Sequence, residues 1–170
     1  MAELHTPRLL LRPAREDDLG PLHAILCDPL ATAYWSTPPH VTLDTTRRWL
    51  DRMIGIPRHE GEDFIVEHRG QVIGKAGFYR FPEIGYIFHP DSWGQGFATE
   101  ALTTVIDHGF ARHPLPCVMA DVDPRNAASL KLLERLGFAR TNYREKSWYI
   151  GGEWCDSVDL VLEPAVWKGR

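Results

Sequence analysis

Two glycines one residue apart, Gly94 and Gly96, give the first spacing in this sequence that suggests chemistry. An apolar run precedes them and a run with helical periodicity follows, so residues 92–96, the glycine turn, connect a strand to a helix. Backbone N–H groups at a helix start are unpaired and lie at the positive end of the helix dipole, and glycines let a ligand approach closely. The segment therefore predicts an anion site without basic side chains, since residues 92–99 contain none. A tight turn without a ligand is the alternative.

Two familiar phosphate motifs compete for this turn. The nucleotide P-loop requires Gly-Lys-Ser/Thr at its end, which is missing from the sequence. The dinucleotide fingerprint fits better, because Asp121 ends the next predicted strand near the distance expected for a ribose-binding carboxylate. However, Thr99 occupies the position of the third Gly or Ala, and about ninety residues of other elements come first. A nicotinamide-dinucleotide-binding oxidoreductase therefore stays open as an alternative.

Apolar periodicity predicts the elements that must position the turn. Strands are expected at residues 8–14, 63–81 (a hairpin), 83–89, 117–122, 138–150 and 153–163. Helices are expected at residues 15–28, 42–56, 98–110 and 123–138. The sequence therefore predicts a mixed α/β domain over residues 1–170 with about four helices.

Capping residues sharpen the ends of two of these helices. Asp17 or Asp18 is expected to cap the first helix. In the last helix, Asp123 is expected at the N-cap and Pro124 at the first helical position, with Gly137 at the C-terminal stop.

Composition excludes several classes of protein. The chain is 44% hydrophobic and 25% charged, with a formal charge of −4 and a pI near 6.0, so it offers no basic face for general nucleic-acid binding. Residues 1–15 lack the apolar core of a signal peptide, and no run approaches the roughly 20 apolar residues of a membrane span. The three cysteines match no disulfide framework or zinc spacing, so we expect reduced thiols in a cytoplasmic protein.

Residues 83–102 followed by residues 123–138 resemble the GNAT superfamily of acetyl-CoA-dependent N-acetyltransferases, most closely its branch of ribosomal-protein N-terminal acetyltransferases. In that superfamily an x-x-Gly-x-Gly/Ala turn holds the CoA pyrophosphate. The N-x-x-S…G-F signature is matched here by Asn126, Ser129, Gly137 and Phe138. Residues 6–19 and 151–163 also resemble that branch. The resemblance implies a single GNAT-like domain with a central, mixed, mostly antiparallel sheet and acetyl-CoA as co-substrate.

The resemblance also implies which residues bind the cofactor. The pyrophosphate falls to the turn and the helix start, which comprise Trp93, Gly94, Gln95, Gly96, Phe97, Ala98 and Thr99. Trp93 replaces the usual Arg or Gln, as is common in this branch. A backbone amide on the preceding strand would stabilise the charge on the thioester oxygen, and the local candidates are Ile87, Phe88 and His89. An ordinary strand whose amides all pair with a neighbour is the alternative.

Acyl transfer to an amine also needs a group that takes the amine's proton. Glu83 is the first candidate, because it starts the strand that runs toward the turn, where partial burial would raise its pKa. A solvated glutamate beside Pro82 is the alternative interpretation. Glu145 and Asp156, on the terminal strands, are the reserve candidates.

The leaving thiolate needs a proton in turn. Asn126 and Ser129 lie three residues apart and so share a helix face, on which the family places cofactor contacts. Many family members carry a tyrosine four residues after this serine as the acid, but Leu133 stands there. The role therefore moves to Ser129, with a helix-surface serine as the alternative.

The acceptor is a peptide or small-molecule amine, whose identity the sequence does not give. Tyr34, Trp35 and Pro38-Pro39 lie in a loop that flanks the acceptor site in this family. The eight histidines show no paired metal spacing, so we expect direct transfer without a metal. We expect a monomer or homodimer that binds neither nucleic acid nor membrane. A GNAT fold that binds CoA without turnover, as a sensor, is the alternative function.

Overall fold

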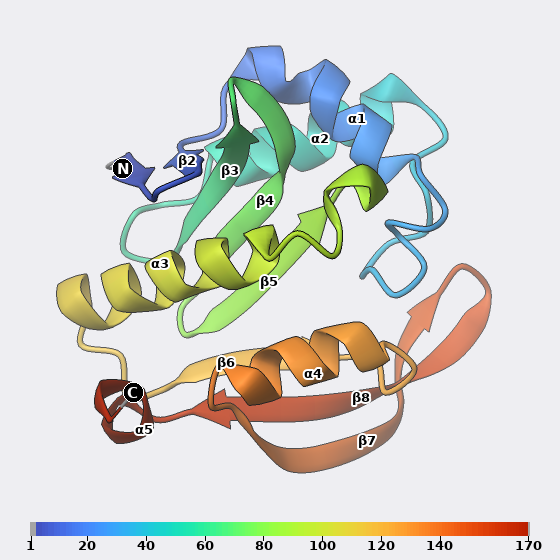
Figure 1. The fold of residues 1–170 in the computed structure, drawn as a ribbon. Coiled ribbons are helices and arrows are strands. Elements are labelled where there is room, and N and C mark those ends of the chain that lie inside the picture. The colour runs from blue at the N-terminus through green and yellow to red at the C-terminus, as the bar shows by residue number, and fades with distance from the viewer. Residues whose placement is uncertain (1–2, 170) are drawn as a thin grey trace.

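The chain forms one eight-stranded sheet with helices on both faces in the computed structural model, which describes residues 3–169 (Figure 1). The strands are β1 (Leu4–His5), β2 (Leu9–Arg12), β3 (Glu62–His68), β4 (Gln71–Arg80), β5 (Glu83–Phe88), β6 (Val118–Val122), β7 (Ala139–Ile150) and β8 (Glu153–Leu162). The α-helices are α1 (Leu19–Leu26), α2 (Leu43–Ile54), α3 (Phe97–Arg112), α4 (Ala127–Arg135) and α5 (Pro164–Lys168). Two 3₁₀ turns are η1 (Glu16–Asp18) and η2 (Pro90–Ser92).

The predicted fold class and order of the main elements are confirmed. Short β1 and α5 were not expected, because a two-residue strand and a five-residue helix are too short for a periodic signal. The predicted domain limits at residues 1 and 170 lie outside the described residues. No helix within the described range has the length and apolar character needed to cross a membrane.

The sheet has the order β1-β2-β3-β4-β5-β6-β8-β7, and its neighbours are antiparallel except for β5 and β6. These two strands run parallel and are joined by one register pair, Glu83 with Met119. Beside it, the Met119 amide donates to the Pro82 carbonyl at 3.0 Å. Beyond this junction β5 and β6 diverge, and the sheet separates into two halves (Figure 1).

Each face of the sheet is covered by its own pair of helices. The larger core cluster includes buried residues of α3 and α4, and the smaller cluster includes those of α1 and α2. Side chains of a strand alternate between faces. Accordingly, Ile84 and Phe88 of β5 pack in the α3–α4 cluster, whereas Ile87 packs in the α1–α2 cluster. β5 thus presents different side chains to two separate environments.

One predicted helix cap is confirmed in position and one is wrong. Asp18 is the N-cap residue of α1, as predicted, but its side chain makes no capping bond to α1. Instead it accepts from the Arg15 amide at 2.7 Å and pairs with buried Arg12 at 2.6 Å. In α4 the N-cap is Asn126, which accepts from the Ser129 amide, and not Asp123. Asp123 instead binds the neighbouring Arg125, because an extra non-helical turn separates it from α4.

Candidate functional site

The glycine turn has the backbone that its sequence predicts. Gly94 and Gly96 have φ values of +71° and +79°, in the left-handed region that disfavours other residues. Gly96 is the N-cap of the 16-residue helix α3, and no side chain caps it. The first amides of α3 therefore lack a side-chain cap and suit an anion, and residues 93–96 directly before them are exposed.

The side chains around these amides mostly support the turn itself. The indole of Trp93 donates to the Phe88 carbonyl at 3.0 Å, and the Gln95 amide group donates to the Asp91 carbonyl at 2.9 Å. Phe97 is buried, so only its backbone can reach a ligand. Ala98 and Thr99 follow in the first turn of α3 and are half-buried.

A cation that sequence reasoning missed lies beside the turn. Arg8, just before β2, donates to the Gln95 carbonyl at 2.9 Å and pairs with Glu100 of α3 at 2.6 Å. Its guanidinium also lies over the Phe97 ring, 4.6 Å from the centroid. No local pattern reveals this contact, because the two segments are about ninety residues apart in sequence.

The three candidate amides of β5 are not equivalent. The His89 amide donates to the Ile73 carbonyl at 2.8 Å, so it is not free for a ligand, and this expectation is corrected. Along a strand, successive amides point to opposite sides of the strand. Ile87, two residues before His89, therefore also turns its amide toward β4, whereas Phe88 turns its amide toward the side from which β6 has diverged. Phe88 is therefore the best placed of the three.

A tyrosine joins Ser129 on the α3–α4 face. The Tyr86 hydroxyl lies 2.6 Å from the Ser129 hydroxyl, so β5 and α4 contact through their side chains. Burial raises the pKa of Tyr86 to about 12, although its bond with Ser129 opposes the shift. Leu133, at the position of the family's tyrosine, is fully buried in the core. Sequence reasoning placed no role on Tyr86, because it lies 43 residues before Ser129.

A large cavity opens on the opposite face of the sheet. The cavity has a volume of about 1070 Å³ and is lined by the α1–α2 loop, by α2, by β3–β6 and by the β7–β8 hairpin. It is called the acceptor cavity after the α1–α2 loop, which the sequence resemblance placed beside the acceptor. The predicted loop residues Tyr34, Trp35, Pro38 and Pro39 all line it. Its carboxylates outnumber its cationic side chains by five to three. The carboxylates are Asp63, Asp121, Asp123, Glu153 and Asp156, and the cations are Arg52, Lys75 and Arg125.

A buried ion pair lies in the wall of the acceptor cavity. Lys75 donates to Asp63 at 2.8 Å and to the Gly85 carbonyl of β5 at 3.2 Å. Burial raises the pKa of Asp63, while the Lys75 charge opposes this. The second oxygen of Asp63 and the indole N–H of Trp35 are the two buried polar side-chain atoms that lack a partner among the described residues.

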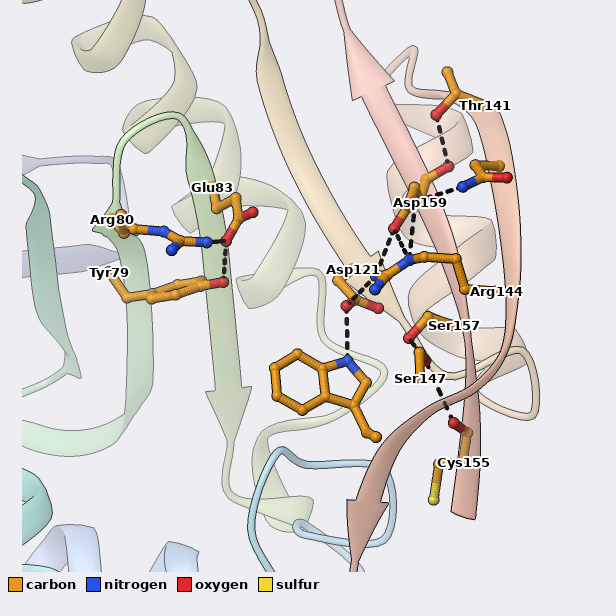
Figure 2. A network of polar contacts seen from close by, with 12 residues as sticks. Tyr79, Arg80, Glu83, Asp121, Thr141, Arg144, Ser147, Cys155, Ser157 and Asp159 are labelled. Atoms are coloured by element: carbon orange, nitrogen blue, oxygen red, sulfur yellow. Dashed lines mark hydrogen bonds and ion pairs between the residues drawn. The ribbon is translucent and has the colours of Figure 1, made fainter.

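Glu83 lies in a different environment from the one that its sequence suggested. Burial alone would raise its pKa, but hydrogen bonds from Tyr79 and Arg80 and the charges of Arg80 and Arg144 lower it overall. The expected rise is therefore wrong. Figure 2 shows Glu83 held by Tyr79 and Arg80 on one side of the sheet separation, with Asp121 on the other side. Glu83 lines a smaller cavity of about 710 Å³, which adjoins the acceptor cavity through shared residues such as Tyr79 and Asp121.

The other candidate carboxylates lie in different environments. Glu145 is exposed and lines neither cavity. Asp156 lines the acceptor cavity, and hydrogen bonds from Tyr143 and the Lys146 amide lower its pKa. Asp121, which the dinucleotide interpretation required, binds the Trp148 indole at 2.9 Å and Arg144 at 2.7 Å.

Comparison with known proteins identifies this arrangement. Residues 8–139 match the family model described as an acetyltransferase (GNAT) domain. An uncharacterised N-acetyltransferase, p20, of Bacillus licheniformis is 35% identical over 150 residues, which cover 82% of this chain and 84% of the relative. The fold matches a ribosomal L7/L12 α-N-protein acetyltransferase, RimL, solved with coenzyme A (TM-score 0.85, 20% identity, 95% and 98% of the two chains). It also matches a spermidine N-acetyltransferase from Vibrio cholerae, solved with CoA and spermine (TM-score 0.82, 20% identity, 96% and 99%).

The chain therefore belongs to the GNAT acetyltransferase family. It is an acetyl-CoA-dependent acetyltransferase, as the resemblance in its sequence implied. The nicotinamide-dinucleotide interpretation is not supported, because the family match spans both the glycine turn and Asp121.

Proposed function

We propose that this protein transfers an acetyl group from acetyl-CoA directly to a primary amine, on a protein N-terminus or a small molecule. The observation that carries the proposal is the separation of β5 from β6 after one register pair. The separation opens along β5 toward its C-terminal end, and β5 leads directly into the glycine turn. One strand therefore connects a place for a thioester with a place for a pyrophosphate.

The cofactor is proposed to lie along β5 with its pyrophosphate on the amides of residues 94–99. The two left-handed glycines give the phosphates close access to the backbone. The Phe88 amide is proposed to bind the thioester oxygen, where preorganised N–H groups stabilise developing charge. Asn126 caps α4 and so holds Ser129 in place beside Tyr86.

The acceptor is proposed to enter from the acceptor cavity, on the opposite face. The cavity volume lies at the upper limit of small-molecule sites, which is about 1,000 Å³, and the excess of carboxylates favours a cationic ligand such as an ammonium group. Gly85 lines this cavity, while its neighbour Tyr86 contacts α4 on the other face. The amine and the thioester would thus approach each other from opposite faces of β5.

The reaction needs two proton movements. The ammonium loses one proton, and the amine nitrogen then forms a bond to the thioester carbon while the carbon–sulfur bond breaks. Glu83 is the proposed first acceptor of that proton, through water, because it lies at the β5–β6 junction. The thiolate takes a proton from the Ser129 hydroxyl, and Tyr86 can then donate a proton to Ser129.

The test follows release of CoA thiol by the purified protein with a panel of acceptors. The panel contains peptides with free N-termini, the same peptides with blocked N-termini, polyamines, amino acids and aminoglycosides. We expect thiol release that requires a free amine, with the acetyl group found on that amine by mass spectrometry. If the protein binds CoA by calorimetry but releases no CoA thiol with any acceptor of the panel, the alternative of a CoA-binding sensor without turnover is supported instead.

The compartment and assembly remain part of the proposal. The described cysteines Cys27, Cys117 and Cys155 are all free thiols, which suits a reducing cytoplasm. A monomer or homodimer is proposed, and light scattering of the purified protein distinguishes the two.

A further inference from the structure

Three potential metal ligands converge at the end of α3 farthest from the glycine turn. His108 Nε2 lies 2.6 Å from Glu62 Oε2, and His113 Nε2 lies 3.1 Å from the same oxygen. One donor atom from each side chain lies within 4.8 Å of the other two. Four residues separate His108 from His113, a spacing found in zinc sites, so the expectation that the histidines show no paired metal spacing is corrected here. Glu62 lies 46 residues before His108 and reaches the pair only in the folded chain.

The surrounding fold fixes the direction of all three side chains. His108 lies in the last turns of α3 and His113 is its C-cap, while Glu62 starts β3. Phe64 packs edge-on against the His108 ring, with centroids 5.9 Å apart, and Phe81 packs against the His113 ring at 4.3 Å. Both imidazoles are therefore held with Nε2 toward the carboxylate.

The cluster is also partly shielded from water. The side chains of Glu62, His108 and His113 are 10%, 12% and 22% exposed. The Glu62 carboxylate supplies a negative charge at this partly shielded place, which favours a cation. The remaining exposure leaves room for water as a further ligand.

We propose that Glu62, His108 and His113 bind one Zn²⁺ ion, with water completing the coordination. Two imidazoles and one carboxylate form a ligand set typical of zinc, with bonds of about 2.0–2.2 Å. Such bonds place tetrahedral ligand atoms ~3.3 Å apart, so the Glu62 oxygen, now 2.6 and 3.1 Å from the two Nε2 atoms, would move outward slightly. The two Nε2 atoms already lie within 4.8 Å of each other. Each imidazole binds as the neutral tautomer with its proton on Nδ1.

This zinc site is separate from the proposed acetyl transfer. The helix α3 has 16 residues and therefore spans ~24 Å, with Gly96 at one end and His113 at the other. The ion would cross-link the end of α3 to the start of β3 and would stabilise the folded chain. Its loss should leave the chemistry at the glycine turn in place.

The same contacts also suit a carboxylate that simply accepts two imidazole N–H bonds, and zinc binding distinguishes the two cases. Chelator-treated protein is titrated with Zn²⁺ at neutral pH against a chromophoric competitor. We expect about one equivalent bound, and weakening by roughly 100-fold or more in His108→Ala, His113→Ala and Glu62→Gln, since loss of a mere supporting residue costs ~10–100-fold. His59→Ala, which removes an exposed imidazole beside Glu60, is the matched control and should bind as wild type.

A spectroscopic readout covers variants that fold poorly. Co²⁺ added to the intact protein should give the visible absorption bands of a four- or five-coordinate site, and one equivalent of Zn²⁺ should remove them. Thermal unfolding of wild type should shift upward with Zn²⁺. No saturable zinc binding by wild type, or equal binding by the folded ligand variants, would overturn the proposal.

Discussion

The hydroxyl oxygens of Tyr86 and Ser129 lie 2.6 Å apart and connect β5 to α4. Burial holds the pKa of Tyr86 near 12, so its phenol stays protonated across the neutral range. A thiolate beside Ser129 would therefore have two protonated hydroxyls in series. We propose that Tyr86 shares the role that the family's tyrosine, at the position of Leu133, would otherwise have.

Removing either hydroxyl should slow the chemical step. We expect Ser129→Ala to lower kcat by roughly 10- to 1,000-fold, because a general acid contributes ~10²–10⁴ and water substitutes in part. Tyr86→Phe should lower kcat by less, and the double variant should resemble Ser129→Ala if the two act as one relay. Steady-state kinetics and a CoA titration check this: CoA affinity should barely change. Wild-type kcat in Ser129→Ala would make the serine incidental.

The glycine turn predicts a selective loss of cofactor binding. Gly96→Val strains a left-handed backbone and closes the approach to the first amides of α3. We expect CoA to bind at least ~10-fold more weakly, which needs a loss of only ~1.4 kcal/mol. Gly70→Val is the control, because Gly70 has φ +76° in the remote β3–β4 turn with open space around it. Equal CoA affinity of the two variants by calorimetry would contradict the proposed pyrophosphate site.

The lowered pKa of Glu83 predicts where its titration appears in the pH profile. A carboxylate whose pKa is below the ordinary 4.5 is ionised throughout neutral pH, so it causes no loss of kcat/KM until the pH falls below that value. Any change of kcat/KM between pH 6 and 9 then reports the titration of the acceptor amine or of another group. We expect Glu83→Gln to reduce kcat/KM at neutral pH and to recover partly as the pH approaches the pKa of the amine.

A matched variant tests whether position or charge matters for Glu83. Glu60→Gln removes the same charge from the wall of the same small cavity, without a hydrogen bond from Tyr79 or Arg80, and should leave the profile unchanged. If Glu83→Gln also leaves the profile unchanged, the base is elsewhere. Asp156 and Asp63, which line the acceptor cavity, would then be tested before the exposed Glu145.

The ion pair between Arg12 and Asp18 predicts a large effect on stability. Arg12→Ala leaves a buried carboxylate without its partner, and such losses cost ~3–5 kcal/mol. Arg15→Ala removes an exposed arginine 3.5 Å from Glu3 and should cost under ~1 kcal/mol. Urea unfolding at constant m-value measures both. Similar midpoints for the two variants would show that burial adds nothing to this pair.

Local chemistry explains which parts of the structure could be predicted from the sequence. The conformations of Gly94 and Gly96, the hairpin at Arg69-Gly70 and the stop at Gly137 follow from backbone sterics, and the structure confirms all of them. Helix faces followed from periodicity in the same way. Asp123 and Asn126 compete for one N-cap, and sequence alone favoured the residue before proline, whereas the fold begins α4 three residues later.

The chemistry of the site depended on contacts between distant segments. The direction of the Glu83 pKa shift requires knowledge of Tyr79, Arg80 and Arg144 together. The contacts of Arg8 with the glycine turn and of Tyr86 with Ser129 form only after β2, β5 and α4 are packed. Residue types therefore predicted which groups could react, while their protonation and partners came from the fold.

The single register pair between Glu83 and Met119 makes the sheet, in mechanical terms, two stiff plates fastened at one edge. Every strand within a plate is paired to its neighbour by at least two register pairs, whereas one pair joins the plates, so small changes in the angle between the plates break few backbone hydrogen bonds. Backbone amides of β5 that face the open edge should exchange with deuterium faster than those bonded to β4. A bound cofactor would act as a spacer of fixed width, and the angle between the plates would then set the distance between amine and thioester.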